Sequence, residues 1–368
     1  GALAMEPSVL VLDEPSSLLD VRGREAIMRV MGRLAKAGVT LVHVTHFMDE
    51  ALAADRVVVM NRGRVALSGT PDEVFCPASE ARIDALGLEM PFEARLTAAL
   101  RTGDVDREIG DGGKRTALPG EGKTPPSPIP PLIRARGLGF SYGPRAHALE
   151  DVTLEVPERA VTAIVGQTGS GKSTLLRLIC GLEAPDSGTL EVCGINASTK
   201  RGRREVRHAV GYVMQHPERQ LFAETVGQDV AFGPRNQGLS ASEVEARVTE
   251  ALGLVGLLAK HDASPFELSG GQQRLAAIAG VLAMRPRLLV LDEPTAGLDP
   301  RGRTHLRAVL ADLAAAGVTL VQVTHSMEDA ARADHVIVLD QSRLLMAGTP
   351  AEVFSASNEP QLTAAGLG

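Results

Sequence analysis

The sequence has no tryptophan and only two tyrosines among its 368 residues, and none of its apolar runs approaches the about 18 residues that a membrane-spanning helix needs. The amino-terminal residues show no basic stretch followed by an apolar one, as a secretion signal would. The net charge of −7 argues against a broad basic face for nucleic acid. We therefore expect no nucleic-acid partner and only a peripheral association with any membrane.

Cysteine and clustered positive charge are also scarce. Cys76, Cys180 and Cys193 are an odd number and lack the spacing of metal ligands, so we expect reduced thiols, mostly buried, as in a cytosolic protein. The one short basic run, Lys200–Arg204, is expected to be a solvated loop.

The sequence does contain a glycine-rich phosphate-binding loop. An apolar run at 162–165 predicts a buried strand before it, and the apolar spacing of 173–180 predicts a helix after it. The glycines let backbone N–H groups turn inward to phosphate oxygens, Lys172 supplies a cation, and Ser173 supplies a Mg²⁺ ligand. The loop consists of Gly166, Gln167, Thr168, Gly169, Ser170, Gly171, Lys172, Ser173 and Thr174.

Two further buried strands are predicted, at 288–291 and 319–323, and each ends in polar residues. Asp292 and Glu293 follow the first, where α/β sheets place their ligands. Asp292 is suited to hold the water shell of Mg²⁺, and Glu293 to polarise an attacking water. His325 follows the second strand. A lone histidine there is often a core residue, but this one is repeated elsewhere in the chain.

A second short motif, at 268–272, precedes a helix predicted over 272–284 and ended by Pro286. Its place at a helix amino terminus favours an anion. The motif consists of Leu268, Ser269, Gly270, Gly271 and Gln272.

Together, these motifs resemble the phosphate loop, signature, Walker B segment and switch histidine of the ATP-binding cassette (ABC) family. The resemblance implies an α/β P-loop NTPase fold with a mostly parallel core sheet and a helical signature subdomain. It implies ATP and Mg²⁺ as ligands, with Glu293, His325 and Gln215 catalytic and with Ser173, Asp292 and Gln215 near the metal. ATP would be sandwiched between two modules, with residues 268–272 contacting the ATP of the partner module.

The resemblance also assigns two residues at the edges of the site. Asp299, in the segment after Walker B, would lie at the seam between modules. Tyr142 matches the place where the family stacks adenine, although a core aromatic is the alternative for this residue. Phe140 is expected in the core.

The segment from Gln215 to Pro234 resembles more narrowly the ATPases of energy-coupling factor (ECF) transporters, which import vitamins or cobalt and nickel ions. This implies an ATP hydrolase at the cytoplasmic face of the cell membrane, with a transmembrane scaffold and substrate-binding membrane subunits as partners. The stretch 217–232 would then face the scaffold, and we expect its apolar side chains to form an exposed patch: Leu221, Phe222, Val226 and Phe232.

Two other functions remain open: the ATPase of another ABC importer, or a soluble tandem-cassette translation factor. The acidic charge, the proline-rich segment between the two halves and the 215–234 segment argue against the translation factor. The transported solute cannot be read from the chain.

The chain also repeats itself. An offset of 279 residues relates Asp13 to Asp292 and His46 to His325, without a gap to Phe75 and Phe354, and with about half of the positions identical. We therefore expect 1–96 to be the carboxy-terminal half of a first ABC domain, 97–131 a flexible Gly/Pro-rich linker and 132–368 a complete domain. A gene that begins near Met5 is the alternative, but it would open a domain on a bare core strand.

The first copy should keep remnants of a second site. These are Asp13, Glu14, Asp20 and His46, the counterparts of Asp292, Glu293, Asp299 and His325. Leu18 stands where the second copy has Gly297, so the backbone at the interface between modules should differ in this copy. The second module needed for an ATP sandwich would be intramolecular in an intact tandem protein, or a second copy of this chain.

Overall fold

The computed structural model describes residues 7–91 and 131–367, apart from 17–18, 20, 46, 89, 144–145 and 299. The chain divides into two compact units, one holding residues 1–127 with 299–303 and the other holding 128–298 with 304–368. The predicted linker lies outside the described residues except for Pro131, which begins the first strand of the second unit. The domain boundaries stay a prediction.

The first unit contains two small sheets. Strands β1 (Val9–Asp13) and β2 (Thr40–Val44) are parallel, and β3 (Val57–Asn61) and β4 (Arg64–Gly69) are antiparallel. Its helices are α1 (Val21–Lys36), α2 (Met48–Ala51), α3 (Pro71–Val74) and α4 (Glu80–Leu86), with a 3-10 turn at Pro77–Ser79. The small core of this unit lies around β3 and comprises Val57, Val59, Val74, Phe75, Ile83 and Met90.

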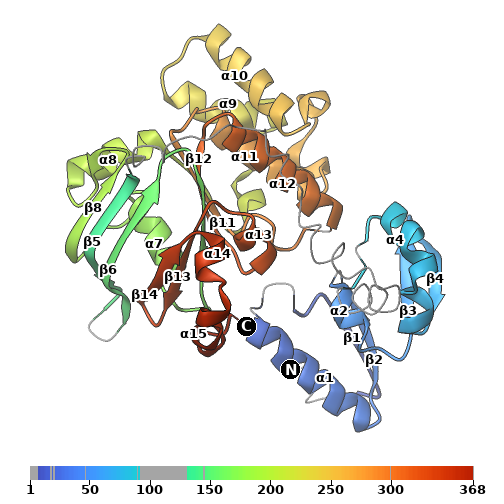
Figure 1. Ribbon diagram of the computed structural model, residues 1–368. Helices are drawn as coiled ribbons and strands as arrows, with labels where there is room; N and C mark the ends of the chain where they lie inside the picture. Colours follow the sequence, from blue (N-terminus) through green and yellow to red (C-terminus); the bar gives the residue numbers. More distant parts are fainter. Residues whose placement is uncertain are drawn as a thin grey trace, which may run out of the picture. The chain divides into compact units, whose positions relative to one another are not determined.

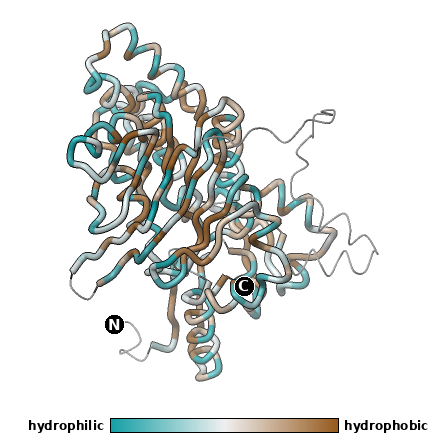
Figure 2. Tube along the Cα trace, turned by 60° about the vertical axis from the view of Figure 1, so that its left-hand side comes forward, coloured by the Kyte–Doolittle hydropathy of each residue, from teal (hydrophilic) through white to brown (hydrophobic). Residues whose placement is uncertain are grey.

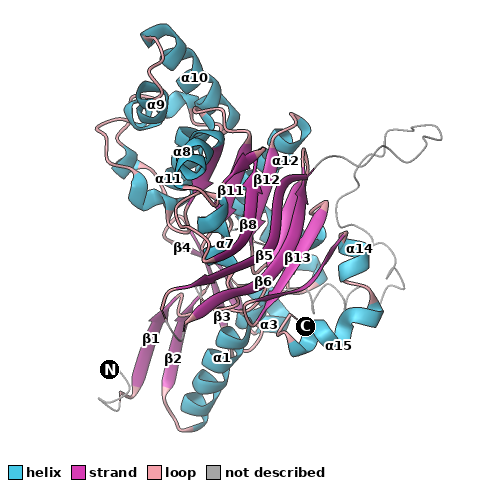
Figure 3. Ribbon diagram, turned by 90° about the vertical axis from the view of Figure 1, so that its left-hand side faces the viewer, coloured by secondary structure: helices cyan, strands magenta, loops and turns pink. Residues whose placement is uncertain are grey.

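A six-stranded sheet forms the centre of the second unit, in the order β10-β11-β12-β7-β13-β14, and only β14 is antiparallel to its neighbour. Figure 3 shows β11, β12 and β13 of this sheet as magenta arrows. Two of its strands, β11 and β12, are buried along their whole length, which explains the apolar runs in the sequence. The strands are β7 (Val161–Val165), β10 (Val210–Val213), β11 (Leu288–Asp292), β12 (Thr319–Val323), β13 (His335–Asp340) and β14 (Arg343–Gly348).

A second, antiparallel sheet has the order β6-β5-β8-β9. Helix α7 (Lys172–Ile179) packs in one core cluster with residues of both sheets, so the helix that follows the phosphate loop is held from two sides. In Figure 2 the brown, apolar segments concentrate along these strands. The strands are β5 (Pro131–Ser141), β6 (His147–Pro157), β8 (Ser187–Val192) and β9 (Ile195–Asn196).

A helical subdomain stands at the top of Figure 1. It contains α9 (Val226–Asn236), α10 (Ala241–Leu254) and α11 (Gly270–Leu282), with 3-10 turns at Pro217–Gln220 (η3), Leu258–Lys260 (η4) and Pro265–Glu267 (η5). These elements share a core with β10, β11 and α12 (Pro300–Ala315). The remaining elements are α8 (Lys200–Ala209), α13 (Met327–Ala331), α14 (Pro350–Val353), a 3-10 turn at Ala356–Asn358 and α15 (Glu359–Ala364).

The expectation of a loop at Lys200–Arg204 is wrong, because this run forms the first half of α8. Thr199 caps the helix by accepting a hydrogen bond from the Gly202 N–H at 3.0 Å. Val206 is fully buried and anchors the helix, while most of the charged side chains remain exposed. The amphipathic spacing therefore outweighs the concentration of charge.

All three cysteines are free thiols, as expected, and Cys180 and Cys193 are buried. Burial raises the pKa of both buried thiols, so they remain protonated. Within the residues that the structure describes, no helix is both long and apolar enough to cross a membrane.

Candidate functional site

The phosphate loop joins the end of β7 to the start of α7. Gly166, Gly169 and Gly171 all have positive φ, at 151°, 85° and 101°. A Cβ atom at Gly166 would collide with the Leu339 carbonyl, and one at Gly171 with the Ala148 carbonyl. The backbone conformation therefore favours glycine at all three positions, and at Gly166 and Gly171 the space available requires it as well.

Two polar side chains of this loop are buried. Lys172 Nζ donates hydrogen bonds to the carbonyl oxygens of Gly166 and Gln167, each at 2.7 Å, so the ammonium group is held inside the loop. The hydroxyl of Ser170 is buried and has no hydrogen-bond partner among the described residues. A buried cation beside an unsatisfied hydroxyl fits an anionic ligand that brings its own acceptors.

An acidic side chain and two hydroxyl groups meet at the end of β11. Asp292 makes a side-chain hydrogen bond with Ser173, the second residue of α7, and its Oδ2 accepts one from the Tyr212 hydroxyl at 3.4 Å. Burial, reinforced by the charge of Glu293, raises the pKa of Asp292. A bound cation would relieve this cost, and a hydroxyl with a carboxylate is a donor set that suits Mg²⁺.

Glu293 and His325 meet one residue farther along the same sheet edge. Glu293 Oε1 lies 2.9 Å from His325 Nε2, and the Gln215 side chain also hydrogen bonds to Glu293. The backbone of Glu293 has a positive φ of 50°, and its N–H donates to Val323 of β12 at 3.0 Å. The structure thus brings together the three residues predicted to be catalytic.

The charge state of Glu293 follows from these neighbours. Burial alone would raise the pKa of this carboxyl group, but the hydrogen bond and charge of His325, with Lys172 and Gln215, outweigh it and hold the pKa below its usual range. The group is therefore a carboxylate near neutral pH, as a proton acceptor requires.

Tyr142 lies immediately after β5, and its hydroxyl is 3.3 Å from Thr174 Oγ1 in α7. Its ring packs edge-on against Phe140, with the centroids 4.9 Å apart, and the residue is 58% exposed. Phe140 is buried, as expected. An exposed ring beside the phosphate loop favours a stacking platform over a core role for Tyr142.

The predicted signature motif caps α11. Ser269 is the N-cap residue and forms a reciprocal capping box with Gln272, and Ser269 and Gly270 are exposed. Gly271 and Gln272 are half-buried. Leu268 is buried in the helical subdomain, so it anchors the motif and does not itself face a partner.

Arg274, two residues beyond the motif, is a connection that the sequence analysis missed. Its buried guanidinium donates to the carbonyl oxygens of Pro294, at 3.1 Å, and Ala296, and lies 3.7 Å from Glu218 of η3. The signature helix is thus joined both to the segment after Glu293 and to the segment after Gln215. An arginine followed by the apolar run 275–279 was the available signal.

The first unit repeats part of this geometry. Glu14 follows β1 with a positive φ of 44°, and its N–H donates to Val44 of β2 at 2.9 Å, as Glu293 does to Val323. Asp13 is the last residue of β1. Three of the predicted site residues, Asp20, His46 and Asp299, lie outside the described residues.

The fold, the glycine-rich loop and the paired strand-end residues define a P-loop ATPase module, and comparison with known proteins identifies the family. A family model described as ABC transporter matches residues 149–296. EcfA2, the energy-coupling factor transporter ATP-binding protein of Symbiobacterium thermophilum, is 52% identical over 224 residues, 60% of this chain and 77% of that protein.

A longer relative covers both units. A Bifidobacterium longum protein named as an ABC transporter ATP-binding protein is 43% identical over 356 residues, 92% of this chain, so the chain spans only 45% of that relative. Among solved structures, cbiO1 of Clostridium perfringens, described as part of the ABC transporter complex cbiONQ, matches with a TM-score of 0.58 at 35% identity, over 64% of this chain and 95% of that one.

A further solved structure is the ATP-binding cassette MJ0796, a post-hydrolysis dimer bound to ADP and Pi. It matches with a TM-score of 0.54 at 27% identity, over 60% of this chain and 99% of that one. The chain belongs to the family of ABC transporter ATPases, and the predicted α/β ABC-type fold is confirmed.

Proposed function

We propose that this chain binds and hydrolyses ATP to drive an ECF-type importer. The observation that carries the hydrolytic part is the contact between Glu293 and His325 at the sheet edge next to the phosphate loop. In this arrangement Glu293 accepts a proton from, or orients, the attacking water, His325 holds the carboxylate ionised, and Gln215 hydrogen bonds to the same carboxylate.

The remaining roles follow from the chemistry of the loop. When ATP binds, Lys172 exchanges its hydrogen bonds to the loop carbonyls for hydrogen bonds to phosphate oxygens. The backbone N–H groups of 166–174 bind the same phosphates. Tyr142 stacks on adenine. Ser173 and Asp292 would hold Mg²⁺, which supplies charge neutralisation to the phosphates. Ser269 and Gly271 contact the ATP of a partner module, with Asp299 at the seam.

Charge neutralisation of Glu293 gives a direct test. Replacing Glu293 by Gln keeps the shape of the side chain but removes the base, so we expect ATP binding to survive while turnover falls by about 10²-fold or more. Steady-state hydrolysis and binding of a fluorescent ATP analogue measure the two properties. Turnover within a few-fold of the parent would refute the assignment.

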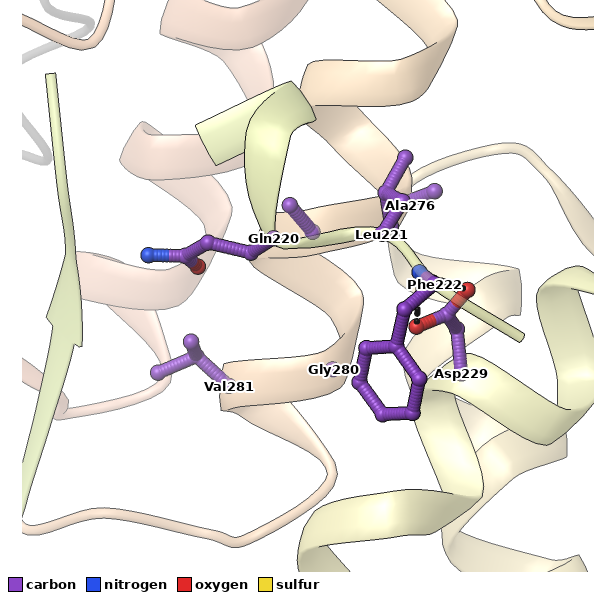
Figure 4. Close-up of a pocket in the computed structure, with 8 residues that line it drawn as sticks. Gln220, Leu221, Phe222, Asp229, Ala276, Gly280 and Val281 are labelled. Carbon is purple, nitrogen blue, oxygen red and sulfur yellow. Dashed lines mark hydrogen bonds between the residues drawn. The ribbon is translucent and has the colours of Figure 1, made fainter. Parts of the chain in front are cut away.

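The ECF-type assignment rests on the similarity to EcfA2 and cbiO1 and on the segment 215–234. It implies a cytoplasmic, peripheral position at the membrane, with a transmembrane scaffold and substrate-binding subunits as partners, and a vitamin or a cobalt or nickel ion as the solute. The surface we assign to the scaffold is the pocket shown in Figure 4, between η3, α9 and α11.

Small residues on α11, namely Ala276, Ala277 and Gly280, leave room in this pocket, and Phe222 forms its rim. The buried Asp229 carboxylate holds the rim in place by accepting the N–H groups of Phe222, at 3.2 Å, and Ala223, at 3.0 Å. Phe222 also packs edge-on against Phe232, with their centroids 5.0 Å apart. A rigid apolar rim beside a small-residue floor suits an apolar side chain of a partner helix.

The predicted patch is smaller than the sequence indicated. Phe222 and Phe232 are exposed, at 62% and 49%, but Leu221 and Val226 are buried in the helical subdomain. The expectation that all four are exposed is therefore wrong, because the first turn of α9, with Val226, faces the core, and Leu221, directly after η3, packs into the same core.

We also propose that residues 1–96 are the carboxy-terminal half of a first ABC domain. Val9, Val11, Val42 and Val44, on β1 and β2, are 47–64% exposed. Their counterparts at the offset of 279 are Leu288, Val290, Val321 and Val323, which are fully buried in the cluster that includes α7. Among the described residues, this exposed valine face, which we call the bare valine face, therefore lacks the cover that a phosphate-loop helix gives in the second unit.

A further inference from the structure

A cluster of one hydroxyl and three charged side chains links chain segments near the catalytic pair, and none of its members has a role assigned above. Asp329, 5% exposed in α13, accepts a hydrogen bond from the Thr295 hydroxyl at 3.0 Å and one from Arg307 Nε at 2.7 Å. Arg307 in α12 also reaches Glu328, with its two terminal nitrogens 3.0 and 2.9 Å from the two carboxylate oxygens. We call Thr295, Arg307, Glu328 and Asp329 the clasp.

The clasp joins the two chain segments that carry the catalytic pair. Thr295 is two residues after Glu293, and Asp329 is four residues after His325. Between His325 and Asp329, Ser326 caps α13 by accepting the Asp329 N–H at 3.2 Å. A shift of α13 away from α12 would therefore move His325 relative to Glu293.

The electrostatics favour a rigid clasp. The attraction of Asp329 and Glu328 outweighs burial and raises the pKa of Arg307, and Arg307 with Arg332 outweighs burial and lowers the pKa of Glu328. Arg307 and Glu328 therefore stay charged, and the planar fork of Arg307 fixes both the direction and the distance of its contacts. Breaking a buried, charge-assisted contact of this kind leaves Asp329 without its cation.

The first unit shows the same fold without the arginine. At the offset of 279, Met28 stands where the second unit has Arg307, and Glu50 stands for Asp329. Glu50 is held instead by the Thr45 hydroxyl at 2.7 Å and by His43 at 3.3 Å. The hydroxyl of Ser16, the counterpart of Thr295, is buried and has no hydrogen-bond partner among the described residues. The hydrogen bonds that join Thr295, Asp329 and Arg307 are therefore not repeated among the described residues of the first unit.

We propose that Arg307 is a positioning residue for hydrolysis: through Asp329 and Thr295 it fixes the distance between His325 and Glu293, without touching ATP. This inference rests on the proposed ATPase function. It predicts that the chemical step depends on Arg307 while ATP binding does not, because Lys172 and Tyr142 lie outside the clasp.

The test compares three variants. In Arg307→Met, which copies the first unit, we expect kcat to fall about fivefold to tenfold with little change in KM for ATP. Arg307→Lys keeps the charge but loses the fork, so its kcat should lie between those of the parent and the methionine variant. Arg332→Met is the matched control: it removes a 2.9 Å ion pair to the same Glu328 without touching Asp329, and its kcat should equal that of the parent.

A double variant separates positioning from general destabilisation. If Arg307 acts through His325, then adding Arg307→Met to His325→Ala should lower the residual kcat no further. Amide hydrogen exchange of 324–331 provides a readout that needs no turnover, and exchange there should be faster in Arg307→Met than in Arg332→Met.

The outcomes are distinct. Equal kcat in the parent and Arg307→Met, with unchanged exchange, would overturn the inference, and so would fully additive losses in the double variant. If the folded parent shows no Glu293-dependent turnover, the proposed function fails, and hydrogen exchange still decides whether the clasp holds the histidine segment.

Discussion

At the scale of single residues, the site depends on groups that are placed at some energetic cost. Glu293 adopts a positive φ, which costs roughly 1–3 kcal/mol for a residue other than glycine, and its carboxylate is largely removed from water. The hydrogen bond to Val323 holds the backbone, and His325 holds the charge. The counterpart Glu14 has the same backbone geometry, so the conformation belongs to this strand ending and does not depend on one set of neighbours.

The influence of His325 on Glu293 predicts a change in pH dependence. Because the pKa of Glu293 is lowered, turnover should persist as the pH falls until that lowered pKa is reached, where the carboxylate takes up a proton. In His325→Ala, burial is less opposed, so the pKa should rise and the loss of turnover should begin at a higher pH. The pH profile of the residual kcat measures this shift. An acid limb that stays in place or moves to lower pH would contradict it.

At the scale of elements, the pocket between η3, α9 and α11 makes a prediction about coupling. Phe222→Asp should abolish binding to membrane vesicles from cells that contain the transporter, because it places a charge on the apolar rim, while ATP hydrolysis by the isolated chain should continue. Vesicle co-sedimentation measures binding. Leu258→Asp, at an apolar residue that is 49% exposed in η4, is the control and should bind as the parent does.

The buried neighbour of Phe222 distinguishes a surface effect from unfolding. Leu221 is 9% exposed, so Leu221→Asp should lower the thermal stability, whereas Phe222→Asp should not. If Phe222→Asp also melts early, then this side chain belongs to the core and the assignment of the surface fails.

Some elements could be predicted from the sequence because their signals are local. The strands β7, β11 and β12 are short, mostly apolar runs that end at or just before glycine or polar residues, and α11 has a capping box at its start. The burial of Leu221 and Val226 depends on how the end of η3 and the start of α9 pack against α10 and α11, which no local pattern encodes. The partners of Arg274 and Arg307 lie at least 20 and 21 residues away along the chain, so a local pattern can mark such an arginine but cannot identify its partners.

At the scale of the whole molecule, the chain carries one complete phosphate loop and one described signature motif. If ATP is bound between modules and residues 1–368 act alone, hydrolysis needs two copies to pair, and specific activity should rise with protein concentration until dimers saturate. Concentration-independent turnover by a proven monomer would contradict the pairing.

Mixing inactive chains sharpens this test. Lys172→Ala removes the phosphate loop cation and Ser269→Arg blocks the signature, so each variant alone should be inactive. A mixed dimer pairs an intact loop with an intact signature at one site, and an equal mixture should regain about a quarter of the parent activity. No recovery in the mixture, with dimers present, would count against a site shared between chains.

The bare valine face predicts that the two units unfold at different temperatures. Each of Val9, Val11, Val42 and Val44 gives up part of the roughly 1.5 kcal/mol that full burial of a valine contributes, whereas their counterparts in the second unit gain nearly all of it. Two stretches of closely similar sequence in a single polypeptide should therefore have unequal melting points. On heating, β1 and β2 should unfold at a lower temperature than β11 and β12, because the side chains of β1 and β2 gain less stabilisation from burial.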